Sequence, residues 1–195
     1  MRDSLSMFNE LVESVKKQNS DLATENKALK DENKQLTRRV SELEQYSRLN
    51  NVEIKGVPAT KGESCLAVVQ SMGDAVGCKI APEDLDTVHR VPAKKDTNII
   101  ARFCSREKKT EFLKKVRKAR LTTAALGFSQ NNQKPLYAND HLTQERKRLF
   151  AQALELKKAK GWKHLWTDHC MIKARRTDDS RVYRISSAGD LAVLA

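Results

Sequence analysis

A heptad repeat runs through the first fifty residues of the chain. Apolar side chains recur every seven positions, and a second register of Val and Asn lies between them. The repeat begins at Leu5, and its seam contains Phe8, Val12, Val15, Asn19, Leu22, Asn26, Leu29, Asn33, Leu36, Val40 and Leu43. One helix cannot bury a stripe of this length by itself. The repeat therefore predicts a coiled coil over residues 1–49 and a protein that works as a homo-oligomer.

Three successive asparagines, Asn19, Asn26 and Asn33, occupy a positions of this repeat. An Asn at a is satisfied when its counterpart lies level with it, which favours a parallel, in-register assembly. Val at a with Leu at d favours two strands, but the pattern leaves dimer and trimer open. The alternative interpretation is a single amphipathic helix that packs on the rest of the chain.

The net positive charge of the chain lies after the heptad repeat. Residues 1–50 hold nine Lys and Arg and nine Asp and Glu, whereas residues 51–195 hold 28 and 16, a net charge of +12. A surface this basic attracts a polyanion, most commonly nucleic acid. The charge pattern predicts nucleic-acid binding, although a merely solvated surface gives the same count.

Composition and cysteine usage narrow the class of protein. No apolar run reaches the roughly 20 residues of a membrane span, and the N-terminus lacks a signal-peptide pattern. We therefore expect an intracellular protein, cytoplasmic and also nuclear. The four cysteines stand singly and are expected to be reduced thiols. His164, His169 and Cys170 lack known ligand spacings, so we predict no metal and no cofactor.

Residues 50–139 predict a domain of strands and helices. Strands are expected over residues 52–57, 85–91, 98–103 and 136–138, and helices over residues 65–76 and 105–120. The order βαββαβ is that of the ferredoxin or RNA-recognition sandwich. The second helix is expected to bury Phe112, Val116 and Ala119.

An RNA-recognition domain usually stacks bases on aromatic residues of its first and third strands, and this platform is missing here. Residues 102–120 instead carry nine basic side chains against two acidic ones. Nucleic-acid binding by this domain would therefore use phosphates and show little sequence preference. The alternative is a protein-interaction domain whose basic helix is merely soluble.

Residues 140–195 predict a small C-terminal domain. Thr143 can cap a helix over residues 144–160 that ends before Gly161. Short strands follow over residues 162–167, 170–175 and 181–186, the last two joined by a turn at residues 177–180.

Trp162 and Trp166 are expected to lie in the core between the C-terminal helix and the hairpin. The alternative is that they are base-stacking platforms. The predicted fold class is therefore α+β, with an N-terminal parallel coiled coil, an RNA-recognition-like domain and a small C-terminal domain. The candidate nucleic-acid-binding residues are basic side chains of the two folded domains: Arg102, Arg106, Lys108, Lys109, Lys114, Lys115, Arg117, Lys118, Arg120, Arg146, Lys147, Lys173, Arg175, Arg176, Arg181 and Arg184.

Three stretches carry a resemblance to a known family. They are EQYSRLNNVEI at residues 44–54 followed by GVP at 56–58, YANDHLT at 137–143, and KKAKGW at 157–162 with Trp166, Thr167 and IKARR at 172–176. They resemble insect retroelement proteins of the baculovirus FP (few-polyhedra) family. The layout is also similar to that of the RNA-binding protein encoded first in long interspersed retrotransposons.

This resemblance implies a non-enzymatic protein that coats retroelement RNA and helps strands anneal as a nucleic-acid chaperone. In the retrotransposon relatives, basic residues of the recognition-like domain and of the C-terminal hairpin contact RNA. The residues that match these in kind are Arg102, Arg106, Lys108, Lys109, Arg175 and Arg176. Those relatives are trimeric, whereas the Asn pattern here favours a dimer.

We therefore expect an oligomer that binds single-stranded RNA or DNA, RNA first, in a basic cleft between its two C-terminal domains. Linked copies on one strand would raise avidity. Viral FP proteins are instead associated with virion and occlusion-body formation, so a structural or interaction protein is the alternative. An enzyme with a small-molecule substrate is not expected, because the chain shows no phosphate-binding Gly loop, paired carboxylates or activated nucleophile.

Overall fold

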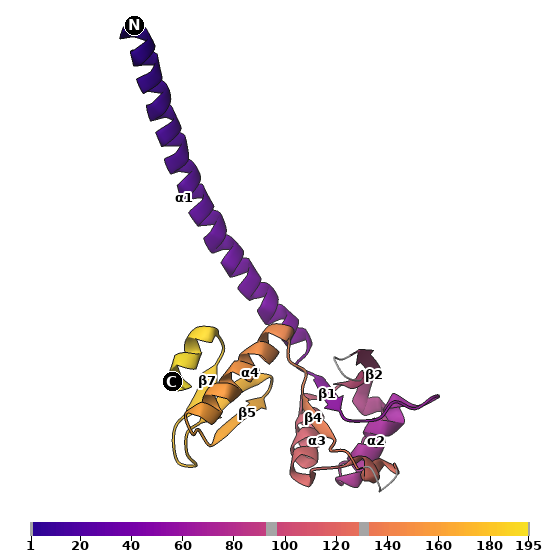
Figure 1. Cartoon of the computed structure of the whole chain (residues 1–195). Coiled ribbons are helices and arrows are strands. Elements are labelled where there is room, and N and C mark those ends of the chain that lie inside the picture. Colours follow the sequence, from indigo (N-terminus) through magenta and orange to yellow (C-terminus); the bar gives the residue numbers. More distant parts are fainter. Residues whose placement is uncertain (1, 93–96, 129–132, 195) are drawn as a thin grey trace. The chain divides into compact units, whose positions relative to one another are not determined.

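The structure is a computed structural model that describes residues 2–92, 97–128 and 133–194, with side chains from residue 6 onwards (Figure 1). It divides into two compact units, Met1–Leu43 and Glu44–Ala195. Within the described residues, none of the helices combines the length and the apolarity that a membrane crossing requires.

The heptad repeat lies on one long α-helix, α1 (Arg2–Ser47). Apart from the half-buried Val12, the described part of its seam is exposed: Phe8 is 60% exposed, Leu29 56% and Leu43 67%. The side chain of Leu5 lies outside the described residues. The prediction of a helix is confirmed, whereas the partner helices of a parallel coiled coil stay a prediction.

A four-stranded antiparallel sheet follows. Its elements are β1 (Asn51–Lys55), α2 (Cys65–Ala75), η1 (Pro82–Asp84), β2 (Leu85–Pro92), β3 (Thr97–Phe103), α3 (Arg106–Ala119), η2 (Thr123–Leu126) and β4 (Tyr137–Asp140). The strand order is β2-β3-β1-β4, and each neighbouring pair is antiparallel. The predicted order βαββαβ is therefore confirmed.

Alternation along the strands sends one set of side chains into the core beneath α2 and α3. Val52 and Ile54 of β1 are fully buried there, and Phe103 of β3 packs against Phe112 of α3 with ring centroids 5.5 Å apart. Glu53 lies between the two apolar residues of β1 and so points to the opposite face. The sequence pattern thus places one face of this sheet under helices and leaves the other to be covered or exposed.

The buried stripe of α3 differs from the predicted one at its end. Phe112 and Val116 are buried as expected, but Ala119 is exposed and Leu113 is buried in its place. The helix ends at this turn, and the chain leaves it through Arg120 in the left-handed conformation (φ 50°). A residue in this last turn no longer lies over the sheet.

The C-terminal part packs one helix on a three-stranded antiparallel sheet. Its elements are α4 (Gln144–Ala159), β5 (His164–Asp168), β6 (Met171–Arg175), β7 (Val182–Ile185) and η4 (Ala188–Leu194), with strand order β5-β6-β7. Thr143 caps α4 as predicted, because its side chain accepts a hydrogen bond from the backbone N–H of Arg146 at 3.4 Å.

The two tryptophans have different positions. Trp162 is 8% exposed in the core with α4, and its ring meets the Tyr183 ring edge to face at 5.7 Å. Leu165 of β5 also packs against this core, so the neighbouring Trp166 points to the other face of the sheet. The prediction of a core position is confirmed for Trp162 and wrong for Trp166. Successive residues of a strand point to opposite faces, and on β5 it is Leu165 that faces the core.

Candidate nucleic-acid interface

A cavity of about 500 Å³ lies between the four-stranded sheet and the C-terminal part. Its walls come from β1, β4, α3, α4 and β5. The lining residues are Glu53, Lys55, Arg117, Asn139, Asp140, Leu142, Lys147, Phe150, Leu165, Trp166 and Thr167. The predicted cleft therefore exists within the unit Glu44–Ala195, but it carries three basic residues against two acidic ones.

The cations of this cleft are largely engaged by the carboxylates beside them. Lys147 of α4 lies 2.9 Å from Glu53 of β1, which also accepts a hydrogen bond from Asn98 at 2.9 Å. Burial favours the neutral carboxyl of Glu53, but Lys147, Lys55 and Asn98 outweigh it and lower the pKa of Glu53. The buried negative charge is therefore retained, and Lys147 serves to balance it.

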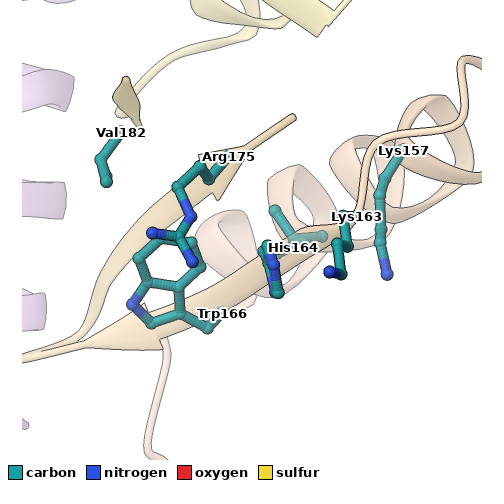
Figure 2. A pocket seen from close by; sticks show the side chains of 7 residues that line it. Lys157, Lys163, His164, Trp166, Arg175 and Val182 are labelled. Atoms are coloured by element: carbon teal, nitrogen blue, oxygen red, sulfur yellow. The ribbon is translucent and has the colours of Figure 1, made fainter. Parts of the chain in front are cut away.

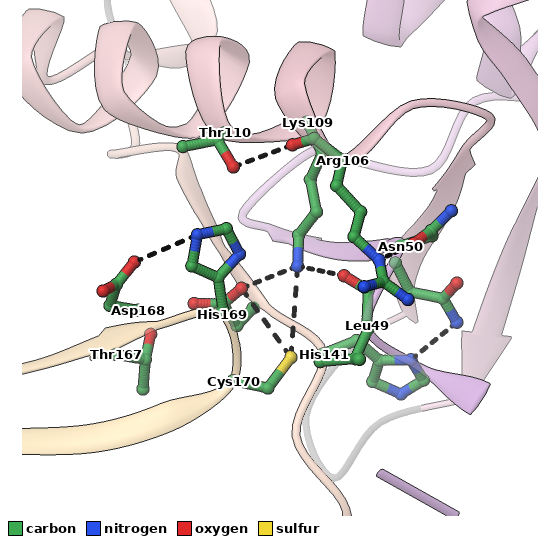
Figure 3. A network of polar contacts seen from close by, with 12 residues as sticks. Leu49, Asn50, Arg106, Lys109, Thr110, His141, Thr167, Asp168, His169 and Cys170 are labelled. Carbon is green, nitrogen blue, oxygen red and sulfur yellow. Dashed lines mark hydrogen bonds and ion pairs between the residues drawn. The ribbon is translucent and has the colours of Figure 1, made fainter. Parts of the chain in front are cut away.

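A buried network joins α3 to the C-terminal part (Figure 3). The Lys109 ammonium lies 2.7 Å from the Asp140 carboxylate and donates to the Leu49 carbonyl at 2.6 Å. The Cys170 sulfur lies 4.0 Å from the same ammonium. Arg117 reaches the same carboxylate at 3.5 Å. Lys109 is 2% exposed. We therefore remove Lys109 from the predicted binding residues, because its charge is already used inside the protein.

Asp140 keeps its negative charge in this network although it is buried. Burial would raise the pKa of Asp140, but attraction and hydrogen bonding to Lys109, with smaller contributions from Thr167 and Arg117, lower it. Burial raises the pKa of the Cys170 thiol to about 11. Cys170 is thus a neutral thiol at physiological pH. Arg146 donates to the Cys170 carbonyl at 2.9 Å. We call the contact region between the four-stranded sheet and the C-terminal part the junction; it contains Glu53, Lys109, Arg117, Asp140, His141, Arg146, Lys147 and Cys170.

The face of the three-stranded sheet that points away from α4 collects another set of basic residues. Trp166 pairs with Lys173 across β5 and β6, and Lys173 pairs with Arg184 across β6 and β7. His164 and Arg175 form the next pair along the same face. We call this surface the open face, defined by His164, Trp166, Asp168, Lys173, Arg175, Val182 and Arg184. Asp168 pairs with Lys173 at 2.6 Å.

Part of the open face is hollowed into a pocket of about 360 Å³ (Figure 2). It is lined by Lys157, Lys163, His164, Leu165, Trp166, Arg175 and Val182, with no acidic residue among them. Asp178, in the turn after β6, pairs with Lys163, with His164 at 2.6 Å and with Arg175 at 3.6 Å. The Arg175 Nε is buried and has no hydrogen-bond partner among the described residues. The pocket therefore combines a half-buried indole with Lys163, His164 and Arg175, which all contact the carboxylate of Asp178.

The basic residues of α3 form a separate surface. Lys108 and Lys115 lie 3.8 and 2.8 Å from Glu111, and Lys115 also donates to the Gly77 carbonyl. Lys114, Lys118 and Arg120 are exposed. This part of the predicted set is accessible to a ligand.

Four predicted residues lie at other positions. Arg102 points away from the helices on the four-stranded sheet and pairs with Asp86 at 3.2 Å. Arg106 lies over the Tyr46 ring at 5.6 Å and donates to Asn50, while Arg181 lies over the Tyr183 ring at 5.5 Å. Arg176 is exposed just after β6. The structure thus divides the predicted set among the junction, α3 and the two sheets.

Sequence reasoning missed the pocket residues Lys157, Lys163 and His164 as binding candidates, and it placed Trp166 in the core. The available signal was the alternation in β5, where Leu165 stands between His164 and Trp166. His164 and Trp166 therefore share a face that cannot also be the face of Leu165.

The cysteines and histidines do not assemble a metal site in the described part of the chain. All four cysteines are free thiols, as predicted. No group of three or more His, Cys, Asp or Glu that could hold a metal ion occurs among the described residues. His164 instead pairs with Asp178, and Cys170 lies in the junction with Asp140.

The C-terminal part corresponds to a known class of domain. Residues 143–195, which hold α4, the three-stranded sheet and η4, match the family described as Baculovirus FP protein domain 2. This match supports the resemblance to the baculovirus FP family. No curated protein matches the chain.

Proposed function

We propose that this protein is an oligomeric, non-enzymatic protein that binds single-stranded nucleic acid, RNA first, with little sequence preference. The observation that carries the proposal is the open face, where Lys173, Arg175 and Arg184 lie side by side on neighbouring strands. The net charge of +12 on residues 51–195 agrees with a polyanionic ligand. A retroelement ribonucleoprotein, in which the protein also acts as a chaperone for annealing, is the setting that we infer.

The four-stranded part is, in this proposal, an RNA-recognition-type domain that has lost the usual binding face. Its element order and its strand order β2-β3-β1-β4 support this assignment. In such domains the face away from the helices stacks bases. Here that face contains Glu53 and Ile100, both buried, and Glu53 is engaged by Lys147 of α4. We therefore assign strand binding to the open face and to the exposed cations of α3.

Oligomerisation gives weak sites their strength in this proposal. The exposed seam of α1 provides the apolar stripe of a coiled coil, and Asn19, Asn26 and Asn33 favour parallel copies in register. Copies that bind one strand raise each other's effective concentration, which increases avidity by about 10² to 10⁴. Cytoplasmic ribonucleoprotein, with a nuclear share, is the location we propose.

Binding of a labelled oligouridylate across a salt series tests this function. The slope of the logarithm of affinity against that of salt is expected to be about −0.7 for each phosphate contact. A variant with Leu22, Leu29 and Leu36 all changed to Gln is expected to become monomeric and to lose about 10²- to 10⁴-fold in affinity. A matched control changes Ser14, Ser20 and Thr24 to Gln, outside the seam, and keeps both mass and affinity. Absence of RNA binding by the wild-type chain at low salt contradicts the proposal.

The match of residues 143–195 favours a second candidate, a structural or interaction protein of the viral FP type. Its basic surface would then meet acidic proteins or anionic lipid. Changing Lys108, Lys114 and Lys118 together to Glu, with binding to RNA and to anionic vesicles both measured, separates the candidates. The second candidate is supported if the wild-type chain binds vesicles but not RNA and the variant no longer binds vesicles. The first is supported if the wild-type chain binds RNA and the variant does not.

A further inference from the structure

Trp166 occupies a position that packing does not explain. Leu165 beside it contributes to the core with α4, and Trp162 supplies the buried indole of that core. Trp166 lies instead on the opposite face of β5, half-buried, and lines both the pocket on the open face and the cleft toward the four-stranded sheet. Around it lie Lys173, paired with Asp168, and Arg175, paired with Asp178. The indole therefore provides a flat apolar platform beside cations that solvent-accessible carboxylates hold.

The surroundings of Trp166 suit a phosphorylated ligand. Lys173 lies directly opposite it across the strands, and His164 and Arg175 form the next pair. The pocket of about 360 Å³ is at the small end of the range of ligand sites, which is about 300–1,000 Å³. Its size therefore fits a single unit of a longer ligand better than a folded partner.

Asp178 indicates where an anionic group would bind in this pocket. Its carboxylate is held by Lys163, His164 and Arg175, three groups that also line the pocket. The buried Nε of Arg175 still lacks a hydrogen-bond acceptor among the described residues. A phosphate offers more acceptor oxygens than one carboxylate, and an Arg side chain can bind phosphate through two of its donors.

We propose that this pocket binds one nucleotide of a single strand, with the base stacked on Trp166 and the phosphate bound by Lys163, His164 and Arg175 in competition with Asp178. The inference rests on the proposed function and specifies its site. Stacking on an aromatic ring tolerates every base, which agrees with binding that has little sequence preference. An acidic peptide would satisfy the cations but would leave the indole without a stacking partner, so we favour the nucleotide.

The test measures binding of the full chain to a labelled oligouridylate and to an abasic strand of the same length. Trp166→Ala is expected to weaken binding of the oligouridylate about 5- to 150-fold, the effect of losing one stacked base. It is expected to leave the abasic strand and the salt slope unchanged, because no charge is removed. Trp166→Phe keeps a ring and is expected to retain most of the affinity. Tyr137→Ala removes an exposed aromatic of β4 outside this pocket and is the matched control, with wild-type affinity expected.

Asp178→Asn tests the competition. Removing the carboxylate is expected to increase affinity for both strands, because the Lys163 and Arg175 cations and the His164 ring then become available to phosphate. A second readout uses Trp162→Phe, which leaves Trp166 as the remaining tryptophan of the chain. Its fluorescence is expected to be quenched by the oligouridylate and not by the abasic strand. Circular dichroism checks that every variant is folded.

The outcomes separate this inference from the proposed function. Wild-type affinity in a folded Trp166→Ala variant overturns the stacking site while RNA binding by the chain stands. An equal loss on the abasic strand also overturns it, because the effect is then not due to bases. Absence of binding by the wild-type chain overturns the proposed function and this inference with it. Binding of a glutamate-rich peptide that depends on Trp166, without binding of RNA, assigns the pocket to an acidic protein and overturns the nucleotide.

Discussion

The two sheets of this protein differ in how far the face opposite their helices is buried. On the four-stranded sheet this face contains Glu53, 4% exposed, and Ile100, 3% exposed, and α4 supplies Lys147 to balance the carboxylate. On the three-stranded sheet the corresponding face leaves Trp166 half-buried beside Lys173 and exposed Arg184. The four-stranded sheet uses the part of this face around Glu53 and Ile100 for internal packing, and the three-stranded sheet leaves the face around Trp166 open.

The same difference separates the basic residues by role. Lys109, Arg117, Arg146 and Lys147 lie at the junction, where carboxylates or carbonyls of the protein accept their hydrogen bonds. On the open face, Lys173 pairs with Asp168 at 2.6 Å and Arg175 with Asp178 at 3.6 Å, and both carboxylates are accessible to solvent. Positive charge at the junction therefore pairs with buried groups, whereas positive charge on the open face pairs with solvent-accessible carboxylates that a polyanion can displace.

The largest effect is expected when the junction loses Lys109. Lys109→Met leaves the buried Asp140 carboxylate without its closest cation, and removing one partner of a buried pair costs about 3–5 kcal/mol. Lys114→Met, on the exposed side of the same helix, is the matched control and is expected to change stability by less than about 0.5 kcal/mol. Urea unfolding at neutral pH measures both. Equal free energies of unfolding for the two variants would contradict the structural role of Lys109.

A smaller effect is expected from pH at the same junction. Burial lowers the pKa of His141 to about 4, helped by Arg48 and Lys147, while Glu53 opposes the shift. The unfolded chain takes up this proton near pH 6.5 and the folded chain does not. The contribution of His141 to the free energy of unfolding is therefore complete above about pH 6.5 and is lost as the pH drops toward 4. The loss is expected to be smaller than the roughly 3 kcal/mol of the full shift, because solvent screens this partly exposed ring.

Measurement between pH 6.5 and 5.5 keeps the contributions of Glu53 and Asp140 small. Their ordinary pKa values are 4.5 and 3.8 and folding lowers both, so these carboxylates stay largely ionised in this range in the folded and in the unfolded chain. His141→Gln is expected to flatten the pH dependence in this window. A slope that persists in the folded His141→Gln variant would assign the pH dependence to another group.

The smallest effect on stability is expected on the exposed surfaces of the two sheets. Arg184→Gln and Arg102→Gln should each change the free energy of unfolding by less than about 0.5 kcal/mol. Their effects on RNA binding should differ. Losing one phosphate contact reduces the salt slope by about 0.7, which we expect for Arg184, and less for Arg102, whose guanidinium pairs with Asp86 at 3.2 Å. The reverse result would move strand binding to the four-stranded sheet.

Much of the local structure is predictable because its signals are local. Thr143 caps α4 through its own side chain, and the apolar spacing of α3 identifies Phe112 and Val116 as buried. Ala119 fails because the end of α3 depends on where the chain turns away from the sheet. The charged junction also escapes prediction, because a lysine that pairs with Asp140 thirty-one residues later has the same sequence signature as one in solvent.

The sequence by itself determined the long N-terminal helix with its apolar seam, the order of strands and helices, and the separation of a neutral segment from a basic one. These properties follow from spacing, capping and charge, which act over a few residues. Only the tertiary structure decided which face of each sheet is free, because that depends on α4 and β5 meeting β1, β4 and α3 across long stretches of chain. That packing buried Lys109, paired Lys147 with Glu53 and left Trp166 on the open face.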